Sequence, residues 1–244
     1  MPLPASIDQL RSVIRPLLDD RSTSDALASY YALYHPADRT DLFVQPPEAG
    51  AGPARGFLVR ARTGMDLFRP LVTGRLHDDD TARSLFERGL TAGRPVYLTL
   101  LEAEARWAHK HLQMTEVELH RIYRFAPEKY QPEVNVLVVT TSGPDGLPHC
   151  EIRAADRSGA VAGINWQTPR YAEVYVYTDP PVRGRGWGKS VVRALVATIL
   201  KLGRLPLYVV AESNEYSIRL AEAVGFEDTG QREFVGQAVR LSSA

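Results

Sequence analysis

Apolar residues recur along the chain at two spacings, and each spacing predicts a different kind of element. Between residues 10 and 18 the apolar positions follow the i, i+3, i+4, i+7 rule of a helix that packs one face on a core, and Ser6 can cap its start. Elsewhere, short apolar runs lie between turns rich in Pro and Gly, which indicates strands. The chain is therefore expected to mix helices and strands throughout.

The first half is expected to alternate between helices and strands. A second helix, from Ser24 to Tyr34, should end at His35, because Pro36 disfavours the helical conformation in the residue before it. Further helices are expected at 81–90 and 102–114, and strands at 41–45, 56–61, 67–72, 95–101 and 118–125. The Pro-containing stretch 126–133 is interpreted as a connector, so that residues 1–125 form a first domain.

The second domain, residues 134–244, is expected to open with a hairpin. Strands at 134–141 and 149–156 flank a turn in which Asp145 and Gly146 supply the turn chemistry. Two more strands, at 159–167 and 172–178, precede an apolar helix at 191–203. A strand at 206–213, a helix at 214–225 with Gly225 as its left-handed cap, and an extended segment at 226–241 complete the chain.

Composition narrows the classes of function. The 244 residues include 29 basic and 29 acidic side chains without a long basic stripe, which argues against a nucleic-acid partner. No apolar run is long enough to span a membrane, and charges stand where a signal peptide needs an apolar core, so we expect a cytoplasmic protein with no membrane partner. The His residues show no zinc spacing, so no metal is expected. Cys150 has no second cysteine to pair with and is expected to be a buried, inert thiol.

The two halves share a short pattern. The segments GRPVYLTL (93–100) and GRLPLYVV (203–210) each contain Gly-Arg, a Pro and a Tyr, and both the Pro and the Tyr are offset by 111 residues. Each segment is preceded and followed by a predicted helix. An internal duplication would explain the pattern, and so would a chance likeness between two buried strands.

A glycine cluster, VRGRGWGKS (182–190), lies between a predicted strand and a predicted helix start. Free backbone N–H groups and the helix dipole favour an anion at such a place, and glycines let a phosphate approach the backbone closely. A Walker loop would need a glycine where Arg183 stands, and a dinucleotide fingerprint would need one at Lys189, so the spacing excludes both. The pattern that remains is Arg-x-x-Gly-x-Gly, from Arg183 to Gly188.

This pattern resembles the pyrophosphate loop of the GNAT acetyltransferase superfamily. A second element of that superfamily is similar as well: Asn214-x-x-Ser217-x-x-Leu220 followed by Gly225-Phe226. The resemblance covers about residues 134–241. It implies an α/β (α+β) GNAT fold, with a mixed, mostly antiparallel sheet flanked by helices. The layout also resembles two-part GNAT proteins in which the N-terminal half is degenerate and only the C-terminal half keeps the cofactor loop.

The resemblance implies acetyl-CoA as cosubstrate. In this superfamily the strand before the loop separates from its neighbour and pairs with the amides of pantetheine, as an added strand would. The pyrophosphate would then lie on backbone amides from about Arg183 to Ser190. The expected coenzyme A-binding residues are Val176, Tyr177, Thr178, Arg183, Gly184, Arg185, Gly186, Trp187, Gly188, Lys189, Ser190, Asn214 and Ser217. The side chains of Arg183, Arg185 and Lys189 could equally be solvated charges at a helix start.

The first half is expected to bind no cofactor. At the offset of 111 residues it carries Thr73, Arg75 and His77 in place of three loop glycines, followed by three aspartates at 78–80. Side chains would block the backbone approach, and carboxylates would repel a pyrophosphate. The second half lacks the two helices that normally wall the acceptor site of a GNAT domain, so residues 1–125 are expected to supply that wall.

Acetyl transfer to an amine needs the amine in its neutral form, which requires a base or a lowered pKa. Glu173 is the candidate catalytic base, because histone-type GNAT enzymes carry a glutamate at this place in the strand; a solvent-facing strand glutamate is the alternative. Many GNAT enzymes place a tyrosine acid where this chain has Ala221, so no general acid is assigned. Tyr175, Tyr177 and Tyr216 are weak substitutes.

Three functions remain open at this stage. The first is an N-acetyltransferase that acts on a small-molecule or amino-acid-like amine. The second is an acyl-CoA-binding sensor or non-catalytic GNAT-like module, which Ala221 and the degenerate half would suit. The third, acetylation of a peptide or protein, would favour an acidic groove that the neutral composition does not indicate. The sequence does not identify the acceptor, the acyl chain length or the oligomeric state.

Overall fold

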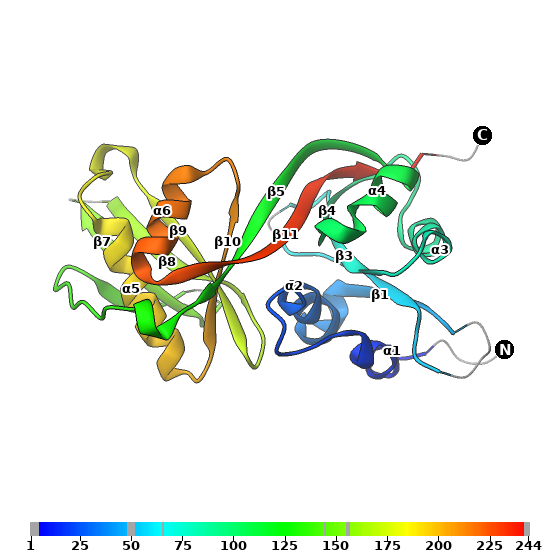
Figure 1. The fold of residues 1–244 in the computed structure, drawn as a ribbon, viewed down its shortest axis with the longest axis horizontal. Helices are drawn as coiled ribbons and strands as arrows, with labels where there is room; N and C mark the ends of the chain where they lie inside the picture. Colours follow the sequence, from blue (N-terminus) through cyan, green and yellow to red (C-terminus); the bar gives the residue numbers. More distant parts are fainter. Residues whose placement is uncertain (1–4, 48–51, 65, 144, 155–156, 242–244) are drawn as a thin grey trace. The chain divides into compact units, whose positions relative to one another are not determined.

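The computed structural model describes residues 5–47, 52–64, 66–143, 145–154 and 157–241 (Figure 1). It divides into two compact units, which are described separately. Unit 1 consists of Met1–His120 and Gln231–Ala244, and unit 2 of Arg121–Gly230. Two long strands, β5 (Gln113–Phe125) and β11 (Phe226–Val239), each contribute residues to both units.

Unit 1 is a sheet covered on both faces by helices. Its strands follow the order β1-β2-β3-β4-β11; β3 and β4 are parallel, whereas the β1–β2, β2–β3 and β4–β11 pairs are antiparallel. The strands are β1 (Thr40–Gln45), β2 (Gly56–Ala61), β3 (Leu71–Leu76) and β4 (Pro95–Leu101). The helices are α1 (Ile7–Ile14), α2 (Ala26–Ser29), which continues as a π-helix through Tyr34, α3 (Asp79–Gly89) and α4 (Ala105–His111).

Alternation along β2 decides which helices cover which face of unit 1. Phe57 and Val59 are fully buried against Ile14 of α1 and Tyr31, which follows α2. Leu58, between them, points to the other face and packs in a second cluster with residues of α3 and α4. Because successive strand side chains point to opposite faces, one strand anchors both hydrophobic layers.

Unit 2 holds the predicted hairpin and the glycine cluster. Its strands follow the order β5-β10-β9-β8-β7-β6. The strands are β6 (Val139–Ser142), β7 (Pro148–Ala154), β8 (Arg157–Gln167), β9 (Tyr171–Thr178) and β10 (Leu205–Ala211), and the helices are α5 (Trp187–Lys201) and α6 (Glu215–Val224). β6 and β7 form a direct antiparallel hairpin without helices between them, as the sequence indicates. The mixed, mostly antiparallel sheet flanked by helices confirms the predicted fold class.

The core of unit 2 lies between the sheet and its two helices. Val191 and Leu195 of α5, Val174 of β9 and Phe226 of β11 are among its buried members. Cys150 is fully buried in the same core, as predicted, and burial raises the pKa of its thiol. Among the described residues, no helix combines the length and the apolar character needed to cross a membrane.

Several helix boundaries follow the predicted local chemistry. Ser6 caps α1 in a capping box with Gln9, and the helical segment after α2 ends at Tyr34, before His35-Pro36. Gly225 ends α6 with φ of 108°, the left-handed conformation that favours glycine at this position. Each of these helix ends depends on residues close to it in the sequence, so the local sequence pattern predicts it.

Two predicted strands are wrong in position. The strand expected at 67–72 lies at Leu71–Leu76, and Leu67 and Phe68 before it are 89% exposed. The strand expected from Val134 begins only at Val139. Val134 and Val136 are 93% and 92% exposed, so their apolar character does not reflect burial. In both segments the apolar pattern predicts a strand, but the side chains face solvent.

The bounds of the units differ from those of the predicted domains. Residues 126–133, the expected connector, belong to unit 2, where the Ala126 N–H donates to the carbonyl of Gly225 at 2.9 Å. The end of the chain belongs to unit 1, because Glu233–Val239 of β11 pair with Pro95–Leu101 of β4. Pairing between strands distant in sequence, which local patterns do not reveal, sets these bounds.

Candidate functional site

The central feature of unit 2 is the separation of two parallel strands. β9 and β10 pair at three positions only, Tyr171 with Leu205, Ala172 with Pro206, and Glu173 with Leu207. On its other side, β9 stays paired with β8 as far as Thr178. From Val174 to Thr178, one edge of β9 therefore has no strand partner within the described chain. An extended ligand with amide groups can pair with such an edge.

Two pockets open where the strands separate. The first has a volume of about 350 Å³ and is lined by Val176, Tyr177, Thr178, Arg183, Asn214, Tyr216, Ser217 and Leu220. The second, of about 200 Å³, includes Val176, Asn214 and Ser217 as well. Six of the residues predicted to bind coenzyme A thus line a single pocket, although they lie in three segments of the chain.

The glycine loop presents open backbone beside this pocket. Gly184 has φ of 81° and Gly186 φ of 78°, a conformation that side chains disfavour, and no heavy atom would lie within 4 Å of a Cβ at either position. Among the described residues, no partner for the backbone N–H groups of 184–189 is found. These amides surround the start of α5, where the helix dipole adds positive potential.

The range of free amides is narrower than predicted. The N–H of Arg183 donates to the carbonyl of Pro180 at 3.2 Å, and that of Ser190 donates to the carbonyl of Gly186 at 3.1 Å. The Ser190 side chain is also engaged, because its Oγ accepts from Nδ2 of Asn135 at 3.1 Å. The prediction that both ends of the segment 183–190 offer amides is therefore wrong, and the free amides are those of 184–189.

Two other residues of the predicted set have packing roles. A Cβ on Gly188 would lie 2.7 Å from Thr178 Oγ1 and 3.0 Å from Leu220 Cδ1, so this glycine lets α5 approach β9 and α6. The Trp187 ring lies against Gly159 of β8, where a Cβ would come within 2.5 Å of the ring. Packing alone therefore explains the tryptophan at 187 and the glycine at 159, without a bound ligand.

The basic residues of the loop differ in their surroundings. Arg183 lines the first pocket, and its Nε donates to the carbonyl of Thr178 at 3.2 Å, which fixes the guanidinium at the end of β9. The guanidinium of Arg185 lies 5.5 Å from the centre of the Trp187 ring. Lys189 is half-buried on the first turn of α5. Arg183 is thus the basic side chain that the structure places in the pocket.

Asn214 and Ser217 shape the pocket from α6. The Oδ1 of Asn214 caps the helix by accepting from the N–H of Ser217 at 3.1 Å. The Oγ of Ser217 lies 2.7 Å from the hydroxyl of Tyr208, whose pKa burial raises to about 12 against the opposing effect of this hydrogen bond. Tyr208 also lines the second pocket. The sequence singled out Tyr208 only as part of the internal repeat.

Glu173 lies at the point of separation but outside both pocket linings. It is half-buried, and it pairs with Trp166 of β8 and Leu207 of β10. Opposite it, β8 has an irregular register between Ile164 and Trp166, and the exposed Asn165 at this bulge lines the second pocket. Nothing in the local sequence predicts this bulge, so the sequence does not indicate Asn165 as a site residue.

Tyr175 and Ala221 bear on the question of a general acid. Tyr175 lines the second pocket, its hydroxyl lies 3.4 Å from Nδ1 of His149, and burial raises its pKa. Ala221 is fully buried, so α6 presents no acidic group at that position. Tyr216 is 49% exposed and lines the first pocket. Geometry therefore places Tyr175 and Tyr216 beside the opening and Ala221 in the core.

Comparisons with known proteins identify similar folds. Residues 157–235 match the family model of FR47-like proteins. A tandem GNAT protein from the clavulanic acid biosynthesis pathway has a similar structure, with a TM-score of 0.63 at 13% identity over 98% of this chain and 96% of that one. A GCN5-related N-acetyltransferase-like protein from Streptococcus suis gives 0.62 at 14% identity, over 96% and 100%. The chain therefore has the GNAT fold.

Other GNAT structures align over similar lengths. A GCN5-related N-acetyltransferase from Kribbella flavida has a TM-score of 0.59 at 14% identity, over 89% of this chain and 95% of that one. No curated protein matches the sequence significantly. At these identities the likeness establishes the GNAT fold, and the chemistry has to be argued from this chain's own residues.

Unit 1 repeats the strand arrangement of unit 2. β3 and β4 are parallel, and in the described part of the chain they pair at Leu71 with Tyr97 and at Val72 with Leu98 alone. Beyond that point the chain's own side chains occupy the opening. The Leu76 N–H donates to Oε1 of the buried Glu104 at 2.8 Å, and Arg75 forms an ion pair with Asp25 at 2.5 Å. The Leu76 N–H, a backbone group beyond the paired part of β3, is thus already bonded within the chain.

The offset of 111 residues does not align the two loops. Thr73 and Arg75 lie within β3 rather than in a loop, and α3 starts at Asp79, directly after its cap. Only His77 and Asp78 separate β3 from α3, whereas residues 179–186 separate β9 from α5. The argument from replaced glycines is therefore wrong, because unit 1 has no counterpart of the loop in which they lie.

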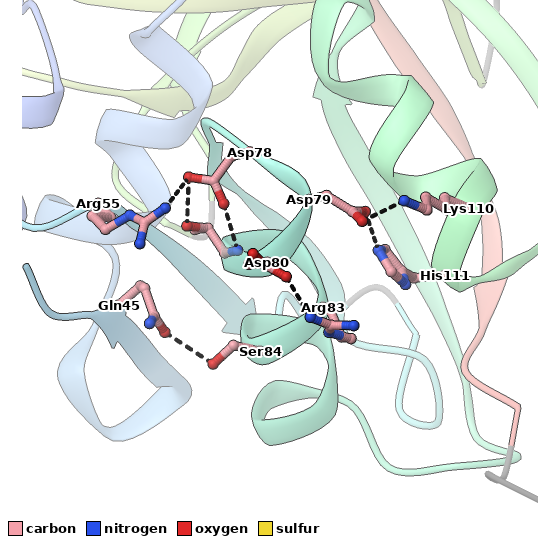
Figure 2. A network of polar contacts seen from close by, with 10 residues as sticks. Gln45, Arg55, Asp78, Asp79, Asp80, Arg83, Ser84, Lys110 and His111 are labelled. Carbon is pink, nitrogen blue, oxygen red and sulfur yellow. Dashed lines mark hydrogen bonds and ion pairs between the residues drawn. The ribbon is translucent and has the colours of Figure 1, made fainter. Parts of the chain in front are cut away.

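The start of α3 is occupied by acidic side chains (Figure 2). Asp78 caps the helix by accepting from the N–H of Thr81 at 2.8 Å, and Arg55 donates to it at 2.7 Å. Asp79 accepts from Lys110, and lies 2.6 Å from Nε2 of His111; these hydrogen bonds hold the pKa of its carboxyl below the ordinary value. These carboxylates fill the place where an anion would bind, which supports the prediction that unit 1 takes no cofactor.

Proposed function

We propose that unit 2 binds acetyl-CoA and that the protein transfers the acetyl group to the amine of a small-molecule or amino-acid-like acceptor. The observation that carries this proposal is the free edge of β9 from Val174 to Thr178, which leads directly to the free amides of 184–189. A long ligand with amides at one end and a diphosphate at the other matches this order of binding groups.

Each part of the site has a separate role in this proposal. The edge of β9 pairs with the amides of the pantetheine arm, and the N–H groups at 184–189 bind the diphosphate. Arg183 adds a charge-assisted hydrogen bond from the wall of the first pocket. The cosubstrate supplies the acetyl group as a thioester. Gly184 and Gly186, both at positive φ, leave open space where their side chains would stand, so the backbone at these two positions fits such a ligand.

Glu173 is the proposed base for the incoming amine. An alkylammonium group has a pKa of ~10.4 and must lose a proton before it can attack a thioester. Glu173 lies at the last paired position before the opening, where a carboxylate can accept that proton directly or through one water. A separate acid is not required in this scheme, because a thiolate with a pKa of ~8.5 is an adequate leaving group.

A non-catalytic, acyl-CoA-binding role is the second candidate. Ala221 is buried at the position where many GNAT enzymes carry a tyrosine acid, and Glu173 does not line either pocket. Binding of acetyl-CoA without transfer to any amine would favour this role. Release of coenzyme A thiol in the presence of one amine from a panel of small amines, polyamines and amino acids would favour the enzyme.

Cofactor binding has a matched pair of variants. Gly186 and Gly203 have nearly the same φ, 78° and 72°, and open space around their Cβ positions, but only Gly186 lies in the loop. Gly186→Glu places a carboxylate beside the proposed diphosphate, while Gly203→Glu imposes the same backbone strain elsewhere in unit 2. Isothermal titration with acetyl-CoA should show at least a tenfold loss of affinity for the first variant and none for the second. Equal affinity in both would refute the loop assignment.

A further inference from the structure

A pocket of about 640 Å³ lies in unit 1, apart from the elements that form the proposed cofactor site. It lies at the end of the sheet where the parallel strands β3 and β4 begin, with walls from Pro70 and Pro95. The separation of β3 and β4 is at their opposite ends, so this pocket is not the counterpart of the opening in unit 2. No role described above uses it.

Arginine dominates the polar lining of this pocket. Four guanidinium groups and two carboxylates line it: Arg39, Arg60, Arg62, Arg94, Asp41 and Asp66. Four positive and two negative charges leave an excess of two positive charges. In a protein with equal numbers of basic and acidic residues, this excess is a local feature rather than a reflection of composition.

Both carboxylates of the lining are already neutralised. Asp41 lies 3.0 Å from Arg60 and 3.6 Å from Arg62, so two guanidinium groups share one carboxylate. Asp66 pairs at 2.8 Å with Arg69, which is outside the lining. Asp41 therefore balances part of the charge of Arg60 and Arg62, and neither carboxylate forms an ion pair with Arg39 or Arg94 among the described residues.

Arg39 and Arg94 remain available. In the described part of the chain, neither guanidinium forms a hydrogen bond or an ion pair, and both residues are exposed. The positive charge of this cluster affects the pKa of the neighbouring His35. Burial lowers that pKa, the charges of Arg39, Arg11 and Arg62 lower it further, and the charge of Asp38 raises it. The lowered pKa of His35 thus indicates a positive electrostatic potential near this side of the pocket.

The rim of the pocket is apolar. Leu67 and Phe68 line it and are each 89% exposed, although large apolar side chains are normally buried. Both belong to the segment where a strand was predicted and where the chain instead forms a loop. Exposed apolar side chains next to unpaired arginines suit a ligand that carries both an anionic group and an apolar group.

We propose that this pocket of unit 1 binds a small organic anion, with its carboxylate, sulfonate or phosphate group at Arg39 and Arg94 and its apolar part against Leu67 and Phe68. Arginine is suited to such anions, because its planar group donates two parallel hydrogen bonds to one anionic group. This site is independent of the proposed transferase activity, and its occupancy needs no coenzyme A.

Two fluorescent probes test the proposal on the full chain. 8-Anilinonaphthalene-1-sulfonate carries an anionic and an aromatic group, and N-phenyl-1-naphthylamine is similar in its rings but lacks the sulfonate. We expect the double variant Arg39→Gln/Arg94→Gln to weaken binding of the sulfonate at least tenfold and to leave binding of the uncharged probe within twofold. Phe68→Ser should weaken binding of both probes.

Arg83→Gln is the matched control, because Arg83 is an exposed arginine of α3 outside the pocket. It should bind both probes as the unmodified protein does. All the substituted side chains are exposed, so thermal unfolding should confirm that each variant folds. The proposal is overturned if the sulfonate does not bind, if the double variant binds it unchanged, or if the double variant loses both probes equally.

Discussion

Glu173 lies directly opposite Leu207, and this is the last residue pair that joins β9 to β10 in the described chain. One residue further along β9, the backbone on that side loses its strand partner. The candidate base is therefore held by ladder pairing on both sides, to Leu207 and to Trp166, while the residues after it are free to bind a ligand. General-base catalysis requires a group within hydrogen-bond reach of the proton that it accepts, and under the proposed function the acceptor amine would have to approach this end of the paired strand.

Glu173→Gln should separate catalysis from binding. The amide keeps the size of the carboxylate but cannot accept the proton of the amine, so we expect kcat to fall about 100-fold or more. The Kd for acetyl-CoA should stay within twofold, because the side chain lines neither pocket. The measurement is thiol release with the best amine of the panel, beside a titration with acetyl-CoA. Unchanged kcat would exclude Glu173 as the base.

Gly188→Ala should destabilise the protein through packing rather than backbone strain. The new methyl would press on Thr178 Oγ1 and Leu220 Cδ1, which lie 2.7 and 3.0 Å from the Cβ position. We expect a loss of about 1–3 kcal/mol in the free energy of unfolding, measured with urea. In a double-mutant cycle, Thr178→Ala should recover part of the loss, because it removes the nearer atom. If the effects of the two substitutions on the free energy of unfolding simply add, the new methyl group is accommodated by movement of atoms other than those of Thr178.

Glu233 should make stability depend on pH. Burial raises its pKa to about 7, against the opposing charge of Arg75, whereas the unfolded chain has a value near 4.5. Between these values the folded protein keeps a proton that the unfolded chain has released, so stability falls as pH rises, by up to about 3 kcal/mol.

Glu233→Gln removes this titration. Urea unfolding at pH 4.5 and pH 8 should show that the variant gains stability relative to the unmodified protein as pH rises, by about 2–3 kcal/mol. Glu87→Gln, an exposed substitution on α3, should leave the pH dependence as it is. If the Glu233 variant and the unmodified protein had parallel pH profiles, the buried carboxyl would not be the source of the dependence.

Asp78 should stabilise unit 1 as a helix cap. Asp78→Ala removes the acceptor for the Thr81 N–H and a partner of Arg55, and we expect a loss of about 1 kcal/mol. Asp78→Asn keeps a capping oxygen and should lose less than half as much. Urea unfolding of the three proteins checks the order, and an asparagine variant as unstable as the alanine variant would point to charge rather than capping.

The fold was predictable where local chemistry sets it. Ser6, Pro36 and Gly225 mark element boundaries that the structure confirms, since each acts on its own few neighbours. The course of β11 was not predictable, because its pairing with β4 joins residues more than a hundred positions apart. The apolar residues Leu67, Phe68, Val134 and Val136 predict strand where none forms, since a sequence does not distinguish an exposed apolar side chain from a buried one.

The sequence predicts the glycine loop of the candidate site, but not all of the residues that line its pockets. The glycine spacing located the positive-φ positions 184 and 186, because only backbone geometry demands glycine there. The same spacing could not tell that Gly188 serves packing, which depends on how near Leu220 lies. Tyr208 and Asn165 reach the pockets through strand pairing and a bulge, and neither leaves a mark in the local sequence.

The path of β11 also bears on how the protein is made. Unit 1 includes Glu233–Val239 of β11, which leave the ribosome only after the whole of unit 2 has been synthesised. Until then β4 lacks the neighbour that Glu233–Val239 provide, and its edge is open to other chains. Completion of unit 1 therefore waits until β11 has been synthesised, and a nascent chain stalled or truncated before β11 would carry an unpaired strand edge that can bind other chains.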